Sequence, residues 1–357
     1  MMELHPGERL VRPSDPMIQY TGRIDDTNPD APVFHYAASS IRLRVRGERL
    51  RIFVHNIHHF YENRLGVIVN GAQRAILLPE NEDAVIDLSA DLTGGEDDVL
   101  LFKRQDSCHA FVLRGVALQG ELLPPPQRPA RRIEVYGDSV SAGEVSEAEH
   151  CCAQVDPPDH QGKYSNSYLS YAWQAARLLG AELHDVAQGG ISLQDGTGYF
   201  NGPNYLGMLT CYDKVRYDPT FGPLTPWDFS RWTPHVVVLA IGQNDAHPEN
   251  FMEADYEGEK ARKWRSDYAH LIALLREKYP RAQIVLTTTI LGHSPQWDQA
   301  IDEVCRCIRE TDKRVHHFLY TNNGCGTPGH IRGSEAAVMA RELADFIGTL
   351  PGVWDEE

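Results

Sequence analysis

One segment of the chain reads Ile133-Glu134-Val135-Tyr136-Gly137-Asp138-Ser139-Val140-Ser141-Ala142-Gly143. Its apolar, β-branched beginning is typical of a buried strand, and the small, polar residues that follow are typical of a tight turn. Gly137 lets the backbone turn sharply, and a helix can begin at the residues after it. We therefore predict that Ser139 lies at the carboxyl end of a strand, where open α/β sheets bind their ligands.

A serine hydroxyl is a poor nucleophile at neutral pH. It needs a nearby base, and it needs donors for the oxyanion that its attack creates. A lone Gly-Asp-Ser is more simply explained as a solvated turn between a strand and a helix. The choice between these interpretations depends on the partners that the rest of the chain supplies.

Downstream of this segment, strand-like and helix-like patterns alternate. We expect strands over residues 133–136, 183–186, 236–241, 284–288 and 317–320, and helices over 168–179, 261–278, 298–309 and 334–350. Alternation of this kind is typical of a parallel, doubly wound sheet. The region over residues 133–357 is therefore predicted to be one α/β domain.

Upstream, from about residue 8 to 120, the pattern is β. Residues 41–46 alternate strictly between apolar side chains and arginine, which is the period of a half-buried strand. Asn70-Gly71 is a strong hairpin signal. Further short strands are expected over residues 50–54, 65–69, 84–88, 99–103 and 111–118. We predict an antiparallel, jelly-roll-like β-sandwich over residues 1–122, which serves as a scaffold or as a carbohydrate-binding module. A stiff, proline-rich linker over 123–132 follows it.

Composition narrows the class of protein. A length of 357 residues suggests two domains, and a net charge of −16 argues against a general nucleic-acid or membrane-surface binder. No apolar run is long enough to span a membrane. The N-terminus shows no signal-peptide pattern, so we expect a cytoplasmic protein unless a leader was removed. The oligomeric state stays open.

The cysteines and histidines raise the question of disulfides and metals. The seven cysteines are odd in number and lack the spacing of a common zinc site, so reduced and mostly buried thiols are expected. Two histidine groups lack an accompanying cluster of carboxylates or cysteines; they are His55, His58 and His59, and His316 and His317. We expect no metal and no cofactor.

Three further motifs follow the predicted strands. Gly189-Gly190 comes after the second strand, Gly242-Gln243-Asn244-Asp245 after the third, and Gly326-Thr327-Pro328-Gly329-His330 before the last helix. The N–H groups of Ser139 and Gly190, together with the Asn244 amide, would make an oxyanion hole. His330 would be the general base. Each motif alone has a structural explanation, but their order on successive strand ends indicates a serine hydrolase site.

These blocks, Gly137-Asp138-Ser139, Gly190, the Gly242–Asp245 stretch and the late histidine, resemble those of the SGNH (GDSL-type) hydrolases. The β-sandwich ahead of them resembles that of the two-domain esterases of carbohydrate esterase family 2, and so do residues 132–139, 167–172 and 226–229. The resemblance covers nearly the whole chain. It implies a three-layer α/β/α catalytic domain. It also implies deacetylation of plant polysaccharides or oligosaccharides, such as xylan, mannan or glucomannan, through an acetyl-serine intermediate.

The chain departs from this family at the third catalytic residue. The superfamily usually has an aspartate two or three residues before the histidine, where this chain has Thr327 and Pro328. Some family 2 members use a Ser–His dyad oriented by a main-chain carbonyl, and we expect the same here. A distant carboxylate, Asp298 or Asp195, is the alternative. Without an adjacent carboxylate, the pKa of His330 should lie near or below about 6.5.

Aromatic side chains are the expected sugar platforms. Trp297, after the fourth strand, is the first candidate, and Trp227, Tyr164 and Tyr199 are the others. The aromatic-rich insertion over residues 194–233 is a candidate substrate loop, although its rings could instead pack the insertion itself.

The expected partner is therefore an acetylated oligosaccharide or polysaccharide, with neither nucleic acid nor membrane. A lipase or thioesterase of the same superfamily is a competing interpretation, which the scarcity of Leu and Ile runs in the loops disfavours. A glycan-binding protein with weak turnover is another, which the missing acid favours. The second glycine of a Gly-x-Ser-x-Gly motif is replaced by Ser141, which argues against an ordinary α/β-hydrolase.

Overall fold

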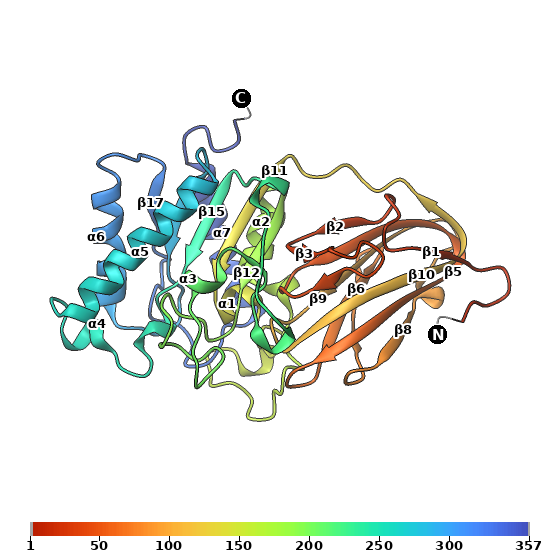
Figure 1. The fold of residues 1–357 in the computed structure, drawn as a ribbon, viewed down its shortest axis with the longest axis horizontal. Coiled ribbons are helices and arrows are strands. Elements are labelled where there is room, and N and C mark those ends of the chain that lie inside the picture. Colours follow the sequence, from red (N-terminus) through yellow and green to blue (C-terminus); the bar gives the residue numbers. More distant parts are fainter. Residues whose placement is uncertain (1–2, 356–357) are drawn as a thin grey trace. The chain divides into compact units, whose positions relative to one another are not determined.

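The computed structural model describes residues 3–355, which divide into two compact units (Figure 1). The β unit runs to Arg128 and also includes Gln161–Lys163 and Val215–Thr225. The α/β unit holds Pro129–His160, Tyr164–Lys214 and the described residues from Pro226 onward. These two short segments of the β unit lie in the sequence of the predicted catalytic domain. The predicted linear division into sandwich, linker and catalytic domain does not include them.

The β unit is built on one antiparallel sheet, as the alternating pattern predicted. Its central path runs β3-β4-β10-β5-β9-β6-β7, with β1 paired to β10, and β2 and β8 paired to β5. The strands are β1 (Arg9–Val11), β2 (Gln19–Thr21), β3 (Ile24–Asp25), β4 (Val33–Phe34), β5 (Ser40–His58), β6 (Arg64–Val69), β7 (Ala72–Leu77), β8 (Asp83–Asp87), β9 (Glu96–Lys103) and β10 (His109–Leu123). The hairpin between β6 and β7 turns at Asn70 and Gly71, both with positive φ, as the Asn-Gly signal predicted.

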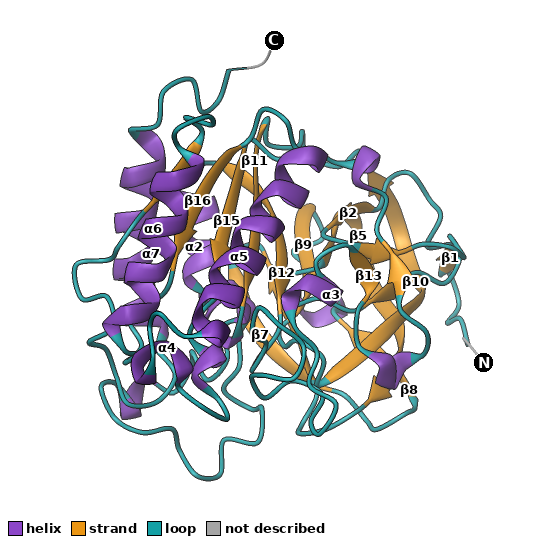
Figure 2. Ribbon diagram, turned by 60° about the vertical axis from the view of Figure 1, so that its left-hand side comes forward, coloured by secondary structure: helices purple, strands orange, loops and turns teal. Residues whose placement is uncertain are grey.

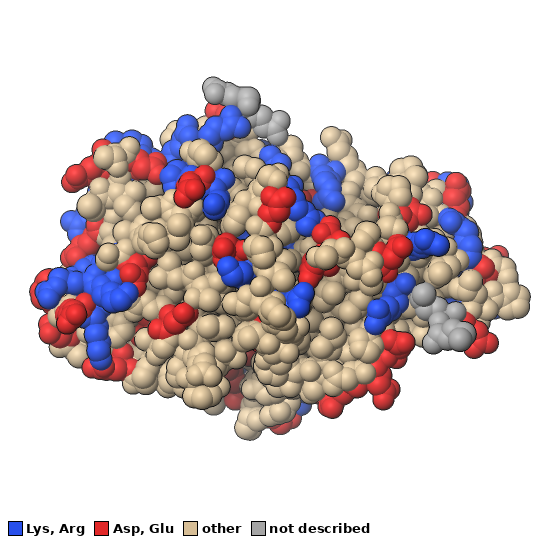
Figure 3. All heavy atoms as spheres, viewed as in Figure 1, with Lys and Arg blue, Asp and Glu red and all other residues tan. Residues whose placement is uncertain are grey.

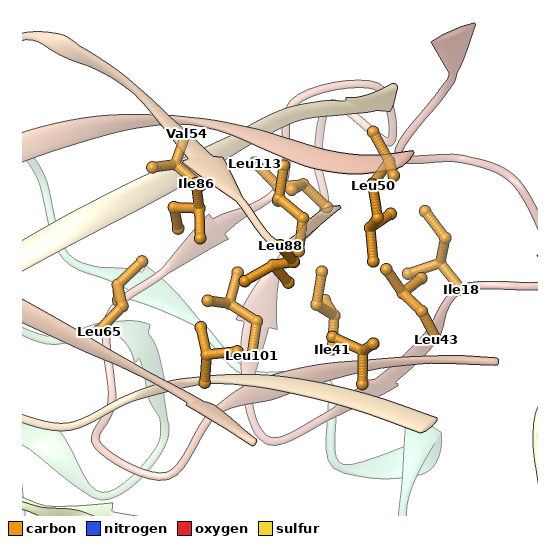
Figure 4. Packing of buried hydrophobic residues seen from close by; sticks show 14 of the residues in the cluster. Ile18, Ile41, Leu43, Leu50, Val54, Leu65, Ile86, Leu88, Leu101 and Leu113 are labelled. Carbon is orange, nitrogen blue, oxygen red and sulfur yellow. The ribbon is translucent and has the colours of Figure 1, made fainter. Parts of the chain in front are cut away.

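The long strand β5 organises this unit. It pairs with β10 from Arg44 to His58, with β9 in its first half and with β8 in its second. Ile41 and Leu43 point into the core, where they lie close to Leu50 and Leu88 (Figure 4). Between them Arg42 faces outward and forms an ion pair with an aspartate of β9. The strict alternation of the sequence therefore separates a buried face from a charged one.

The α/β unit contains the predicted parallel sheet, in the order β12-β11-β15-β16-β17. Its strands are β11 (Arg131–Gly137), β12 (Ala181–Ala187), β15 (Val236–Ala240), β16 (Gln283–Thr287) and β17 (Val315–His317). The chain moves from β11 to β12 on one side, and then crosses back to β15 on the other side of β11. Strand order therefore reverses at β11, and the Gly-Asp-Ser turn lies at the carboxyl end of this strand, the place where open α/β sheets bind ligands.

Four longer helices flank this sheet (Figure 2). They are α2 (Tyr171–Leu178), α5 (Glu259–Lys278), α6 (Pro295–Ile308) and α7 (Gly333–Gly348). Helix α2 packs against α7, and α5 packs against α6. Because right-handed crossovers run in opposite directions on the two sides of β11, the two pairs cover opposite faces of the sheet. The three-layer arrangement is confirmed.

The insertion between β12 and β15 contains α3 (Met208–Cys211), the strands β13 (Lys214–Arg216) and β14 (Thr225–Pro226), and mostly irregular chain. Eight of its nine aromatic rings are at least half-buried: Phe200, Tyr212, Tyr217 and Trp227 are buried, and Tyr205, Phe221, Phe229 and Trp232 are half-buried. Tyr199 is the exception, with 58% of its surface exposed. The structural interpretation therefore holds for most of these rings, and Tyr199 stays a candidate for substrate contact.

Three observations bear on the expectations from composition. Among residues 3–355, no helix is both long and apolar enough to cross a membrane, and no group of three or more potential metal ligands occurs. All seven cysteines are free thiols, but only Cys108, Cys211 and Cys305 are buried, so the expectation of mostly buried thiols is wrong. Basic and acidic side chains are interspersed over the face in Figure 3.

Candidate active site

The predicted nucleophile lies in the turn that follows β11. Ser139 is the first residue of the one-turn helix α1 (Ser139–Ala142), and the Asp138 carboxylate caps this helix by accepting a hydrogen bond from Val140 N at 3.0 Å. A Cβ on Gly137 would lie only 2.0 Å from Ser141 Oγ, so glycine is required there for the turn to close. Ser139 is 6% exposed, and its hydroxyl makes no hydrogen bond with any residue in the range 3–355.

Ser141, the other serine of the turn, has a structural role. It is fully buried, and its hydroxyl lies 2.8 Å from the hydroxyl of Tyr171 at the start of α2. This hydrogen bond joins α1 to α2 beneath the turn. Ser139 is thus the more accessible of the two hydroxyls.

Gly190 lies just beyond β12 and has a φ of +74°, a conformation that favours glycine. A Cβ there would lie 2.8 Å from the Cβ of Tyr199. Its carbonyl accepts hydrogen bonds from Tyr199 N at 2.7 Å and Phe200 N at 3.2 Å, whereas its own N–H has no acceptor within the described chain. That free donor is the property that an oxyanion hole requires.

Asn244 lies beyond β15, and its amide is held by two acceptors. Nδ2 donates to Ile191 O at 3.0 Å and, with a longer bond of 3.3 Å, to Asp138 Oδ2. The same carboxylate oxygen accepts a bond of 2.5 Å from Gln243 Nε2. Burial raises the pKa of Asp138 to about 6, against the opposing effect of these donors. Asp138 therefore links the nucleophile turn to the predicted oxyanion asparagine, a connection that sequence reasoning missed.

His330 is oriented by a carboxylate, not by a main-chain carbonyl. Its Nδ1 lies 2.6 Å from Asp156 Oδ2, and its backbone N–H donates to Asp156 Oδ1 at 3.0 Å. The expected dyad with a carbonyl partner is therefore wrong. Both alternative acids are wrong as well. Asp298 pairs with His293 at 3.0 Å, and Asp195 accepts a bond from Gly207 N at 2.7 Å.

Asp156 lies in an irregular segment, residues 152–160, which we call the acid loop. Arg332, two residues after the histidine and fully buried, anchors this region. Its Nη1 donates to Asp156 Oδ1 at 2.9 Å, and its other nitrogens donate to carbonyls that include Ala148 O at 3.0 Å and Cys151 O at 3.2 Å. A Cβ on Gly329 would lie 2.6 Å from Asp156 Oδ1, so this glycine allows the carboxylate to approach.

A second carboxylate lies at the other nitrogen of His330. Glu144 Oε2 is 3.4 Å from His330 Nε2, and the Glu144 backbone N–H donates to Ser139 O at 2.9 Å. Burial alone lowers the pKa of His330, but the charges of Glu144 and Asp156 outweigh it and raise this pKa to about 10. The expectation of a pKa near or below 6.5 is therefore wrong, because it assumed no adjacent carboxylate.

The four aromatic residues predicted to bind sugar differ in their exposure. Trp297 is fully buried in α6, with its ring centroid 5.2 Å from those of Phe251 and Trp264, so it cannot bind a sugar face. Trp227 is buried as well. Tyr164 is half-buried and meets His150 edge to face. Tyr199 is exposed, its ring stacks on that of His247 with centroids 4.0 Å apart, and its backbone N–H donates to Gly190 O at 2.7 Å.

Two family models match the chain. The carbohydrate esterase 2 N-terminal domain matches residues 20–126, and the GDSL-like lipase/acylhydrolase family matches residues 135–326. An acetylxylan esterase/glucomannan deacetylase of Cellvibrio japonicus is 26% identical over 93% of this chain and 88% of its own length. The cellulase/esterase CelE of Acetivibrio thermocellus is 29% identical over 92% of this chain, which spans only 39% of that larger protein.

Two solved structures are similar to this chain over nearly its whole length. A family two carbohydrate esterase from Clostridium thermocellum, in complex with cellohexaose, is 27% identical with a TM-score of 0.78, covering 94% of this chain and 99% of the other. A family two carbohydrate esterase from Cellvibrio japonicus is 25% identical with a TM-score of 0.79, covering 98% of both chains. These similarities extend through both units.

Proposed function

This chain belongs to the GDSL-like lipase/acylhydrolase family and carries the N-terminal domain of family 2 carbohydrate esterases, and we propose that it removes O-acetyl groups from carbohydrates. The observation that carries the chemistry is the Asp156–His330 pair. Asp156 orients His330 as a base. The Glu144 carboxylate lies 3.4 Å from His330 Nε2 and the Glu144 N–H donates to Ser139 O, so Glu144 connects the base to the nucleophile turn. A serine, a histidine and a carboxylate on loops at one edge of the sheet have the composition of an acyl-transfer site.

In the proposed reaction, Ser139 Oγ attacks the acetyl carbonyl while His330 Nε2 accepts its proton. The negative charge that develops on the carbonyl oxygen is stabilised by the N–H groups of Ser139 and Gly190 and by the Asn244 amide. His330 then donates the proton to the departing sugar oxygen, which leaves an acetyl-serine. Water, activated by the same histidine, releases acetate. Asp156 keeps the proton on Nδ1 and stabilises the imidazolium during both steps.

The proposed substrates are acetylated xylan, mannan or glucomannan, or their oligosaccharides. Two observations support a neutral carbohydrate. The exposed ring of Tyr199, next to the Gly190 turn, offers an apolar face of the kind on which sugar rings pack. The net charge of −16 suits an uncharged polymer better than an anionic one.

The competing functions differ in their support. A glycan-binding protein with weak turnover was favoured by the missing acid, and Asp156 at His330 removes that argument. A lipase or thioesterase of the same family would prefer longer acyl chains.

The test compares 4-nitrophenyl acetate with the octanoate ester, and then follows acetate release from acetylated xylo- and manno-oligosaccharides. We expect preference for the acetate and multiple turnovers on at least one oligosaccharide, both abolished in Ser139→Ala. Preference for the octanoate would favour the lipase. Binding without acetate release would favour the glycan-binding protein.

A further inference from the structure

The catalytic nitrogen of His330 is already engaged in this structure. Nε2 is the atom that must accept the Ser139 proton, yet its nearest partner is Glu144 Oε2 at 3.4 Å. The Ser139 hydroxyl has no hydrogen-bond partner among residues 3–355. Nε2 carries a single proton or a single lone pair, so the carboxylate and the hydroxyl cannot both use it.

The backbone holds Glu144 in this place. Gly143 ends α1 with a φ of +78°, and a Cβ there would lie 2.6 Å from Asn166 O. The next residue, Glu144, is tied to Ser139 O through its N–H at 2.9 Å. Two residues later, Ser146 O accepts a bond of 2.8 Å from Gly333 N, at the start of α7. The turn after the nucleophile is thus fastened both to α1 and to the chain that carries the histidine.

The charges around the imidazole favour its protonated form. Glu144 faces Nε2 from the turn after α1, and Asp156 faces Nδ1 from the acid loop. Asp138, at the end of β11, adds a further acid in the vicinity. Arg332 directs its guanidinium to Asp156 and to the His330 carbonyl, not to the ring. His160, near Glu144, is the other titratable group of this cluster.

His330 forms an ion pair with Glu144 at 3.4 Å, and His160 adds a weaker favourable charge. Burial by itself raises the pKa of Glu144, but the positive charge of His330 outweighs it and lowers this pKa below its usual value. The pair is therefore mutually stabilising: each group favours the charged form of the other. An imidazolium held in this way cannot accept the serine proton.

We propose that Glu144 is a positioning residue that holds His330 in a resting state, in competition with the Ser139 hydroxyl for Nε2. Catalysis begins when Nε2 loses its proton to water, the ion pair with Glu144 dissolves, and the freed nitrogen accepts the hydrogen bond of Ser139. The inference rests on the proposed esterase, in which His330 is the general base. It makes Glu144 responsible for an alkaline dependence of activity.

The test is Glu144→Gln, which keeps the shape of the side chain and removes its charge. The ascending limb of kcat/KM against pH should move to lower pH by about one unit or more, so that activity near pH 7 rises about tenfold. The KM for 4-nitrophenyl acetate should stay the same. Glu147→Gln is the matched control: it removes one charge from the same loop, but its carboxylate accepts a bond from Asn166 Nδ2 at 2.7 Å instead of facing the histidine. Its pH profile should not move.

A second measurement does not depend on turnover. The imidazole pKa of His330, followed by NMR on histidine-labelled full-length protein, should lie well above 6.5 and should fall in Glu144→Gln. The fall should appear even if no carbohydrate is deacetylated, which separates this inference from the proposed function. An unchanged NMR pKa and an unchanged pH profile would overturn the inference. A loss of kcat at every pH would do so too, because it would show that Glu144 assists the reaction. A raised KM confined to oligosaccharides would instead make Glu144 a sugar contact.

Discussion

At the scale of single residues, Asp138 is the link between the nucleophile and the proposed oxyanion hole. Its carboxylate caps α1 through Val140 N and also accepts bonds from the side chains of Gln243 and Asn244. Asn244 donates one amide hydrogen to Ile191 O at 3.0 Å and the other to Asp138 Oδ2 at 3.3 Å. The weaker contact, at 3.3 Å, is the one that a developing oxyanion can replace at low cost.

Asn244→Ala should therefore lower kcat by about 10²–10³, because a donor that serves the transition state is lost. The KM for 4-nitrophenyl acetate should change little, since the ground-state carbonyl needs this donor less. Steady-state kinetics with a melting curve on the same sample checks both points. An effect limited to KM would mean that Asn244 binds the sugar instead.

Tyr199 and Trp297 are aromatic residues in contrasting environments. The Tyr199 ring is exposed, and the Trp297 ring is fully buried. Tyr199→Ala should raise the KM for acetylated oligosaccharides about tenfold, through loss of roughly 1.5 kcal/mol of apolar contact. It should leave the KM for 4-nitrophenyl acetate unchanged. Trp297→Phe should lower the melting temperature without a selective effect on oligosaccharides. Equal effects of Tyr199→Ala on both substrates would contradict a sugar contact.

At the scale of elements, the acid loop depends on the start of α7. Arg332 connects the acid loop to α7 by donating hydrogen bonds to the Asp156 carboxylate and to the carbonyls of Ala148 and Cys151. The charge and hydrogen bonds of His330 and Arg332 outweigh the effect of burial and hold the pKa of Asp156 well below its usual range. The carboxylate is thereby kept ionised and aimed at Nδ1.

Arg332→Met should lower kcat/KM about a hundredfold, since a displacement of about 1 Å in a catalytic group costs that much. A double-mutant cycle with Asp156→Asn separates positioning from general damage. In the Asp156→Asn background, Arg332→Met should change kcat/KM by no more than about twofold. Fully additive losses would mean that Arg332 stabilises the fold without acting through Asp156.

The residues of the site that follow predicted strands, and His330 just before the last predicted helix, could be predicted, whereas the acid in the irregular segment could not. Ser139, Gly190 and Asn244 follow buried strands whose apolar runs are visible in the sequence. Asp156 stands 174 residues before His330 in a segment without any period, so only its contacts reveal it. Gly329 next to the histidine was the one local sign of a close approach.

The error at Trp297 has a different origin. Pro295 is the first residue of α6, a position that proline favours, and this places Trp297 on the buried face of a helix instead of in a loop.

At the scale of the whole molecule, the charges at the active site affect folding as well as activity. The pKa of His330 is raised from about 6.5 to about 10 by folding, which means that folding favours its protonated form. Its contribution to stability is complete below about pH 6.5 and disappears as the pH rises through 10. The pKa values of Asp156 and Glu144 are lowered by folding, so their contribution is lost only in acid.

The melting temperature should therefore fall between pH 6.5 and pH 10, while kcat/KM rises over the same range. In Glu144→Gln the fall in melting temperature should be smaller, because without the Glu144 charge folding raises the pKa of His330 less. Thermal unfolding at half-unit pH steps, alongside the pH–rate profile, checks the coupling. A melting temperature that stays level up to pH 10 would show that His330 is not protonated in the folded protein at neutral pH.

Asp156 is proposed as the acid of a Ser139–His330–Asp156 triad, and kcat/KM for three single Asp→Asn variants tests this assignment. Asp156→Asn should lose about 10⁴ in rate, because an asparagine leaves the imidazole in the wrong tautomer and its positive charge unpaired. Asp195→Asn and Asp298→Asn, whose carboxylates serve a loop turn and His293, should retain most of the activity of the unmodified protein. A loss below about tenfold in Asp156→Asn, or a loss of several thousandfold in either of the others, would contradict the triad.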